Sequence, residues 1–147
     1  MKLVVQRVNH AKVVSVKNSK ILGKIDKGLF VLLGVGRDDD EKKAETLAQK
    51  LSKLRIISDE KGKMNLSILD SNGQILVVSQ FTLYADTSGG NRPSFIDAAE
   101  PVHARKLYEH FIKCLISLGI NVRTGSFGDY MRISLELDGP VTINLIS

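Results

Sequence analysis

The amino-acid sequence predicts an α/β fold, a single compact domain in which two α-helices cover a largely antiparallel, curved or barrel-like β-sheet. Three observations lead to this prediction. The chain has 147 residues, about the size of one domain, and its 43% hydrophobic and 25% charged residues are typical of globular proteins. Short segments rich in Val and Ile outnumber two stretches with helical periodicity. We therefore expect residues 1–147 to form one domain.

The first quarter of the chain predicts four strands. Residues 2–8 and 11–16 are rich in Val and are separated by a polar dipeptide, which predicts two short strands. Residues 21–25 predict an outer strand. The continuous apolar run 29–35 is typical of a strand that is buried on both faces, so we expect it at the centre of the sheet.

A helix and a hairpin are predicted next. The three aspartates at 38–40 provide N-capping carboxylates, and apolar residues then recur at helical spacing as far as Arg55. Asn-Gly at 72–73 stands between the apolar segments 65–70 and 74–83. This dipeptide favours a type I′ turn, in which both central residues have positive φ, and therefore predicts a β-hairpin.

The second half of the chain predicts a long loop, a second helix and three strands. Residues 84–101 are polar, lack periodicity and are long enough to suggest a functional loop. A helix follows from Val102, and Gly119 is placed to end it in a left-handed conformation. The last three strands are predicted in residues 120–125, 131–137 and 140–146.

Composition and charge narrow the possible functions. The net charge of +5 favours an anionic partner such as RNA or a phosphate group. The single cysteine, Cys114, excludes an intrachain disulfide and a multi-cysteine zinc site, favours a reducing compartment and is expected in the core. No signal peptide and no run of about 20 apolar residues is present. We expect a cytoplasmic protein with no membrane partner.

Several motifs are explained by the fold alone. Gly34 and Gly36 could begin a dinucleotide-binding fingerprint, but Asp39 stands at the position where that fingerprint needs a third glycine. A simple turn is therefore favoured. The aspartates 38–40 lack the spacing of a calcium loop. His103 and His110 are seven residues apart, too far for a shared metal on one helix. We expect no metal site and no cofactor.

Two segments suggest chemistry. Residues 79–82, Ser-Gln-Phe-Thr, are polar where an apolar strand leaves the core, although ordinary strand alternation explains them equally well. Residues 138–142, Asp-Gly-Pro-Val-Thr, are compatible with a hairpin turn between the last two strands. The alternative is a cis peptide between Gly139 and Pro140, which occurs in only about 5–6% of X-Pro bonds and would point successive carbonyls in one direction.

These two segments resemble the signature motifs of the D-aminoacyl-tRNA deacylases, formerly described as D-tyrosyl-tRNA deacylases. The resemblance covers the whole chain. It includes VQRV with Arg7, GLFVLLGV followed by DDD, KMNLS, VVSQFTL, the loop pattern from Ala85 to Phe95, and DGPVT. One position departs from the family motif N-x-G-P-V-T, because Leu137 stands in the place of its asparagine.

The resemblance implies a deacylase-like fold and a homodimer that hydrolyses the ester between a D-amino acid and the terminal adenosine of tRNA. Free D-amino acid and tRNA are released, a form of chiral proofreading in translation quality control. Glycyl-tRNA(Ala) is expected to be cleared too, because glycine has no side chain to exclude. The implied partners are the aminoacylated 3′ end and the acceptor stem of tRNA, and no DNA partner is expected.

The resemblance also implies roles for individual residues. Gly139 and Pro140, as a cis pair, would act in the partner subunit's site and exclude L side chains, while Arg7 would orient the turn. Thr82 either lines the pocket or acts as a nucleophile; we favour the former, with the substrate's 2′-hydroxyl assisting attack by water. The implied catalytic segment is Gln80, Phe81 and Thr82, and the implied substrate-binding residues are Ser79, Phe127, Met131, Arg7, Gly139 and Pro140.

Two other functions are compatible with the size and charge. A non-catalytic RNA-binding module fits the net charge, but the chain lacks the aromatic strand motifs of an RRM domain and the GxxG loop of a KH domain. A general esterase would need a nucleophile elbow with a histidine partner, and the sequence contains no such elbow.

Overall fold

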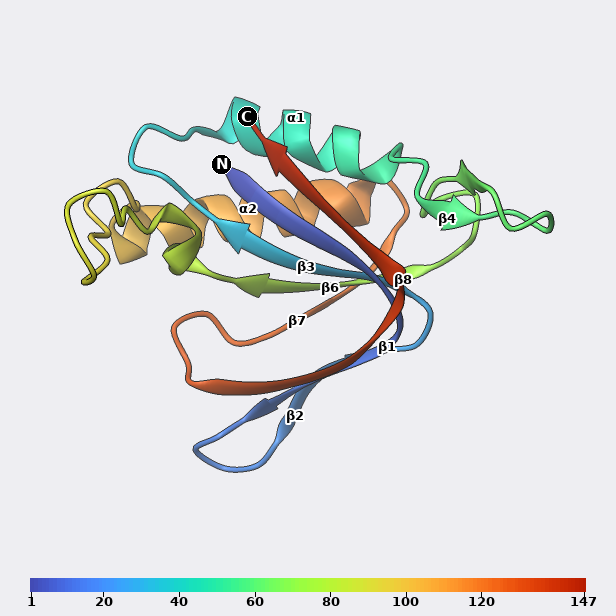
Figure 1. Ribbon diagram of the computed structural model, residues 1–147, viewed down its shortest axis with the longest axis horizontal. Helices are drawn as coiled ribbons and strands as arrows, with labels where there is room; N and C mark the ends of the chain where they lie inside the picture. The colour runs from blue at the N-terminus through green and yellow to red at the C-terminus, as the bar shows by residue number, and fades with distance from the viewer.

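A computed structural model describes residues 1–147 and contains a strongly curved mixed β-sheet with two helices on one face (Figure 1). The expected fold class is confirmed. No helix is long and apolar enough to span a membrane. The elements are β1 (Lys2–Ser15), β2 (Ile21–Ile25), β3 (Gly28–Gly34), α1 (Glu41–Ser52), β4 (Ile57–Ser58), β5 (Met64–Leu66), β6 (Gln74–Ser79), the 3-10 helix η1 (Phe81–Tyr84), α2 (Pro101–Ser117), β7 (Asn121–Thr124) and β8 (Met131–Ile146).

The sheet has the order β2-β1-β3-β6-β7, and β8 pairs with the other side of β1. β1 is antiparallel to β2, β3 and β8, whereas β3, β6 and β7 run parallel to one another. The sheet curls until its edge strands β2 and β7 meet. A Cβ added to Gly23 of β2 would lie only 2.6 Å from the Thr124 carbonyl oxygen of β7, which shows how closely the two strands approach. The result is a nearly closed barrel.

Two apolar cores lie on opposite faces of this sheet. The larger packs under α1 and α2, and the smaller lies inside the curl. Successive residues of the central strands alternate between them: Leu29 and Val31 face the helices, and Phe30 faces the curl. This double burial explains the continuous apolar runs of β3 and β6 and confirms the predicted central strand.

Both predicted helices are present, and their ends follow from the sequence. Asp40 caps α1, since its carboxylate accepts a hydrogen bond of 2.8 Å from the Lys43 N–H. Pro101 occupies the first turn of α2, where its missing N–H costs no hydrogen bond. Gly119 follows α2 with φ of +86°, the left-handed conformation expected of it.

The predicted strand boundaries at both ends of the chain are wrong. Residues 2–8 and 11–16 are not two strands, because β1 continues through the polar dipeptide while pairing with β8. Residues 131–137 and 140–146 are likewise one strand rather than a hairpin. Both halves pair with β1, and residues 138–141 bulge out of the ladder between two of its pairs.

The predicted hairpin around 72–73 is also wrong. β5 pairs with β4, and β6 instead pairs in parallel with β3 and β7. Asn72 has a φ of +50°, but Gly73 does not have positive φ, so the turn is not of type I′. β6 ends at Ser79, where the chain turns into η1 rather than continuing as a strand.

Candidate active site

A cavity of about 760 Å³ opens where β6 leaves the sheet. β3, β6 and β7 are parallel, so the segments that follow their carboxyl ends gather at one edge, the usual place for a binding site in such sheets. Of the residues expected in the site, the cavity brings together Ser79, Gln80, Phe81, Phe127 and Met131.

Segment 79–82 is held at the cavity by the neighbouring strand. The Gln80 N–H donates to the Leu33 carbonyl at 2.7 Å, which continues the β3–β6 ladder by one residue before η1 begins. The Gln80 amide nitrogen donates to the Thr82 hydroxyl oxygen at 2.5 Å. Thr82 is exposed beside the lining. Its hydroxyl has no hydrogen-bond partner except the Gln80 amide, and the polar contacts of the three histidines are with other residues, so no base lies next to Thr82.

The long loop before α2 forms a second wall. Its ends are joined by two backbone hydrogen bonds of 2.8 Å between Asp86 and Ser94. Phe95 then packs edge-on against Phe81, with ring centroids 5.0 Å apart. The loop at 84–101 was predicted to be functional from its polarity, its lack of periodicity and its length. It places the Phe95 ring and residues 98–101 in the cavity lining.

The opposite wall is Phe127, which α2 holds from behind. Its ring lies 5.7 Å from the ring of Tyr108 and 5.3 Å from the Arg105 guanidinium. The Tyr108 hydroxyl donates to the buried Val77 carbonyl at 3.0 Å, and the Gly125 N–H donates to the same oxygen at 3.1 Å. Burial raises the pKa of Tyr108, so this hydroxyl remains a hydrogen-bond donor.

The second predicted motif lies elsewhere. The Gly139-Pro140 peptide is cis, and both residues are exposed and absent from the cavity lining of their own chain. Arg7 is almost fully buried beneath this turn. Its Nε contacts the Asp138 carboxylate at 2.9 Å and carbonyl at 3.3 Å, while its Nη1 donates to the Ile56 carbonyl at 2.9 Å. One chain therefore does not bring the two motifs together.

Comparison with known proteins identifies the family. The sequence profile of the family described as D-Tyr-tRNA(Tyr) deacylase matches residues 4–146. The chain belongs to this family. It is 57% identical to a D-aminoacyl-tRNA deacylase of Thermosipho melanesiensis, over 100% of this chain and 97% of the relative, and 54% identical to one of Lacticaseibacillus casei, over 97% and 95%. The expected enzyme class, a hydrolase acting on the ester of D-aminoacyl-tRNA, is confirmed at family level.

Two solved structures are similar to this deacylase. One is described as the c-Myc DNA Unwinding Element Binding Protein and has a TM-score of 0.92 at 38% identity, covering 100% of this chain and 99% of that one. The other is described as a probable eukaryotic D-amino acid tRNA deacylase, with a TM-score of 0.83 at 14% identity over 98% of both chains. The second likeness concerns the fold alone.

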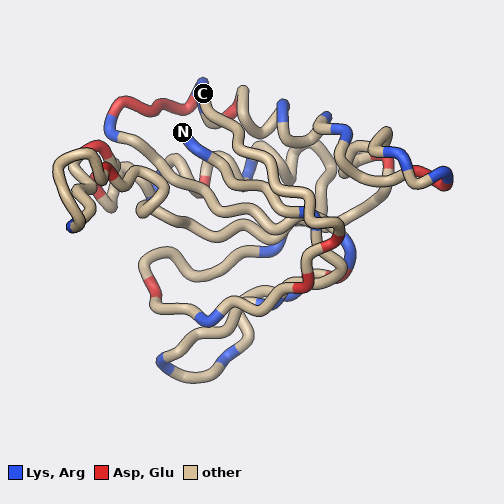
Figure 2. The backbone as a smooth tube through the Cα atoms, viewed as in Figure 1, with Lys and Arg blue, Asp and Glu red and all other residues tan.

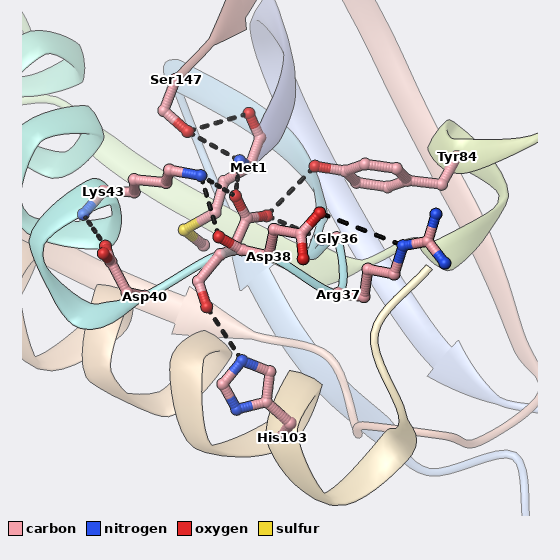
Figure 3. A network of polar contacts seen from close by, with 10 residues as sticks. Met1, Gly36, Arg37, Asp38, Asp40, Lys43, Tyr84, His103 and Ser147 are labelled. Carbon is pink, nitrogen blue, oxygen red and sulfur yellow. Dashed lines mark hydrogen bonds and ion pairs between the residues drawn. The ribbon is translucent and has the colours of Figure 1, made fainter. Parts of the chain in front are cut away.

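A buried polar network that the sequence did not predict lies next to the cavity of the deacylase (Figure 3). Of the three aspartates, only Asp40 is a helix cap. Asp39 is buried and accepts hydrogen bonds from the Met1 ammonium at 2.5 Å, the Gly36 N–H at 2.7 Å and the Tyr84 hydroxyl at 3.1 Å. Because Tyr84 is the last residue of η1, this network anchors the 3-10 helix that begins with Phe81.

Further contacts bind η1 to the start of the chain. The Lys2 ammonium donates to the Leu83 carbonyl at 3.2 Å and lies 4.4 Å from the centre of the Tyr84 ring. Gly36 allows the approach of Tyr84, since a Cβ there would meet that ring at 2.7 Å. The glycines of 34–36, interpreted from sequence as a simple turn, therefore make room for η1.

The network keeps Asp39 ionised and Tyr84 protonated, while burial lowers the pKa of the Met1 ammonium. Burial opposes ionisation of Asp39, but hydrogen bonds from the Met1 ammonium and Gly36, together with the ammonium charge, outweigh it and lower its pKa. Burial and the neighbouring Asp39 carboxylate raise the pKa of Tyr84, which keeps its hydroxyl protonated and donating. A second cation, the Lys43 ammonium, lies 3.4 Å from Asp39.

Proposed function

We propose that this chain removes D-amino acids from tRNA as a chiral proofreading enzyme and releases free tRNA and D-amino acid. The observation that carries the proposal is the cavity at the end of β6, lined by Ser79, Gln80 and Phe81 of the signature motif, in a member of the deacylase family. Residues 1–147 act as one domain in the cytoplasm, where the substrate is found.

The motif segment supplies position and polarity rather than a nucleophile. Gln80, Phe81 and Thr82 hold the terminal adenosine and the ester, with Ser79, Phe127 and Met131 as walls. The N–H groups of Phe81 and Thr82 begin η1, make no backbone hydrogen bond and are available to an oxyanion. Thr82 has no neighbouring base, so attack by water assisted by the substrate's 2′-hydroxyl is favoured over a covalent intermediate.

The chiral filter requires a second copy of the chain. Gly139 and Pro140 lie on the surface, outside the cavity of their own subunit, and are held there by Arg7. In the proposed homodimer, this turn enters the partner's cavity and occupies the space that an L side chain would need. A D-amino acid directs its side chain elsewhere and glycine has none, so D-aminoacyl-tRNA and glycyl-tRNA(Ala) are both accepted.

The tRNA body is bound through its phosphates. Lys and Arg are spread over α1, the β4–β5 loop and β2 rather than gathered in one patch (Figure 2). Contacts between these side chains and phosphate groups position an acceptor stem without reading its sequence. The name of the relative that is 38% identical refers to a DNA element. Duplex DNA is therefore the control ligand, and we expect it not to compete with tRNA.

The deciding experiment compares D-tyrosyl-tRNA, L-tyrosyl-tRNA and glycyl-tRNA(Ala) at catalytic enzyme concentration, with release of the amino acid as the readout. We expect the D and glycyl esters to be hydrolysed and the L ester to persist. Hydrolysis of all three would refute the chiral filter. If none is hydrolysed while tRNA still binds, the chain is a non-catalytic RNA-binding module.

The role of the second subunit has its own test. Ala98→Trp fills the cavity, and Gly139→Ala disrupts the turn because Gly139 has a φ of +129° and an added Cβ would meet Val141 at 2.9 Å. After subunit exchange between the two variants, a mixed dimer contains one intact cavity facing one intact turn. Recovery of D-specific hydrolysis supports the proposed dimer, and no recovery despite proven exchange contradicts it.

A further inference from the structure

A second groove, of about 430 Å³, lies behind the wall of the cavity, between α2 and β7. Phe127 lines both hollows, and no other residue does. A ligand that extends beyond the cavity on this side therefore passes over Phe127 and enters the groove. The floor of the groove includes a second aromatic residue, Tyr108.

The groove carries a row of charges from one helix. Arg105, Glu109 and Lys113 line it and are spaced four residues apart, so they share one face of α2. Neither Arg105 nor Lys113 forms an ion pair, whereas the neighbouring Lys106 pairs with Glu41 at 2.8 Å on another face. Lys113 makes no side-chain hydrogen bond, and Arg105 lies against the Phe127 ring and donates to the Phe127 carbonyl at 3.5 Å. The groove thus presents two cations without an ion-pair partner and one carboxylate, a net positive charge.

This combination suits single-stranded nucleic acid. Proteins that hold a single strand combine cationic side chains, which track the phosphates, with aromatic rings next to the bases. The substrate in the proposed function ends in an unpaired strand, and its next phosphate lies on the 5′ side of the adenosine in the cavity. A simple ester of an uncharged amino acid has no anionic group for Arg105 and Lys113.

We propose that the groove between α2 and β7 binds the phosphate backbone of the tRNA 3′ strand immediately 5′ of the terminal adenosine. Lys113 and Arg105 contact phosphate, and Glu109 weakens the interaction. This inference rests on the proposed function and assigns the path of the substrate beyond the cavity. The phosphate contacts contribute to tRNA binding and not to the step at the ester.

The test uses two substrates, D-tyrosyl-tRNA and D-tyrosyl-adenosine, which lacks every phosphate. Lys113→Gln should raise KM for D-tyrosyl-tRNA about three- to tenfold at low salt and reduce the slope of log KM against log salt by about 1. Glu109→Gln should lower KM for the same substrate. Neither variant should change kcat, or any constant for D-tyrosyl-adenosine. The two substitutions each remove one charge from the same helix face, and opposite changes in KM cannot both arise from unfolding.

Lys27→Gln is the matched control, because Lys27 is an exposed lysine in the turn between β2 and β3 and its side chain makes no hydrogen bond or ion pair. If Lys27→Gln and Lys113→Gln had equal effects on KM for the tRNA substrate, the groove would not be a specific binding path. Equal effects on both substrates, or no effect of Lys113→Gln on the tRNA substrate, would overturn it as well.

Binding of uncharged tRNA, measured by mobility shift, separates this inference from the proposed function. Weaker binding by Lys113→Gln and tighter binding by Glu109→Gln support the groove even if the wild-type chain hydrolyses no ester. If wild-type protein hydrolyses D-tyrosyl-tRNA while neither variant alters tRNA binding, the proposed function stands and the groove is refuted.

Discussion

The two signature segments are both anchored by a buried charged residue, but in different ways. η1 rests on Asp39, whose side chain is 5% exposed and pairs with the ammonium of Met1, a residue that is 1% exposed. The turn at 138–140 rests on Arg7, which is 10% exposed while its partner carboxylate on Asp138 is 45% exposed. Removing one partner of a fully buried ion pair leaves the other charge buried without compensation, which is strongly destabilising. A half-exposed partner can instead be solvated by water. The first anchor therefore governs stability, and the second mainly governs geometry.

The largest expected effect follows from Asp39→Asn. The substitution leaves the Met1 ammonium buried without a carboxylate, and we expect a loss of about 3–5 kcal/mol in the free energy of unfolding. Denaturant unfolding measures it. Asp38→Asn is the control, because the Asp38 side chain is 92% exposed and should change stability by less than about 0.5 kcal/mol. Equal losses in the two variants would contradict the distinction between the anchors.

The pH dependence of this pair sharpens the comparison. The pKa of Asp39 is lowered from 3.8 in the folded state, so the folded protein binds a proton there less readily than the unfolded chain. Its stabilising contribution is complete above the ordinary carboxyl pKa and is lost as the pH falls through the folded pKa. The difference in unfolding free energy between wild type and Asp39→Asn should therefore shrink on acidification. A difference that grows as the pH falls has the wrong sign for this explanation.

Arg7→Lys keeps the charge of the second anchor but removes its planar set of donors. Arg7 contacts Asp138, the Ile56 carbonyl and the Ser58 hydroxyl at once, which one ammonium cannot reproduce. We expect about 1–2 kcal/mol of lost stability and, under the proposed function, a larger relative loss in discrimination between D- and L-tyrosyl-tRNA. Unchanged discrimination alongside lowered stability would make Arg7 structural only.

Tyr84→Phe removes a single hydrogen bond from the first anchor and leaves the ion pair intact. Because that bond goes to a charged group, we expect a loss of about 1.5 kcal/mol, or roughly 3–6 °C in Tm. Asp39 retains its other partners, so the loss must be smaller than that of Asp39→Asn. A scan of melting temperature for both variants in one buffer provides the comparison.

Thr82→Ala should have the smallest effect on hydrolysis. The hydroxyl accepts a hydrogen bond from Gln80 and has no base beside it, so its removal should lower kcat for D-tyrosyl-tRNA by less than about tenfold. Single-turnover rates measure this directly. Loss of all detectable hydrolysis with normal folding would establish Thr82 as a nucleophile and refute water attack.

Much of the cavity was predictable from the family motifs, whereas the local pattern of residues 79–82 was explained equally well by an ordinary strand. Ser79, Gln80 and Phe81 of the first signature motif are brought together with Phe127 and Met131 at the cavity, and the loop before α2 supplies Phe95 as a further wall. The role of Asp39 was missed, since helix capping is a sufficient reason for an aspartate before α1. Only the presence of three carboxylates, where a cap needs one, pointed to a further role.

Periodicity and end signals in the sequence determined the two helices and the doubly buried strand at 29–35, and the resemblance of the motifs determined the family. Only the tertiary structure decided how the strands pair. Polar residues and an Asp-Gly dipeptide favour turns locally, yet β1 and β8 run on through such positions because the two strands pair with each other on both sides of the bulge at 138–141. The meeting of Asp39 with Met1 and Tyr84 likewise joins residues 38 and 45 positions apart, a proximity that depends on how the whole sheet and its helices pack.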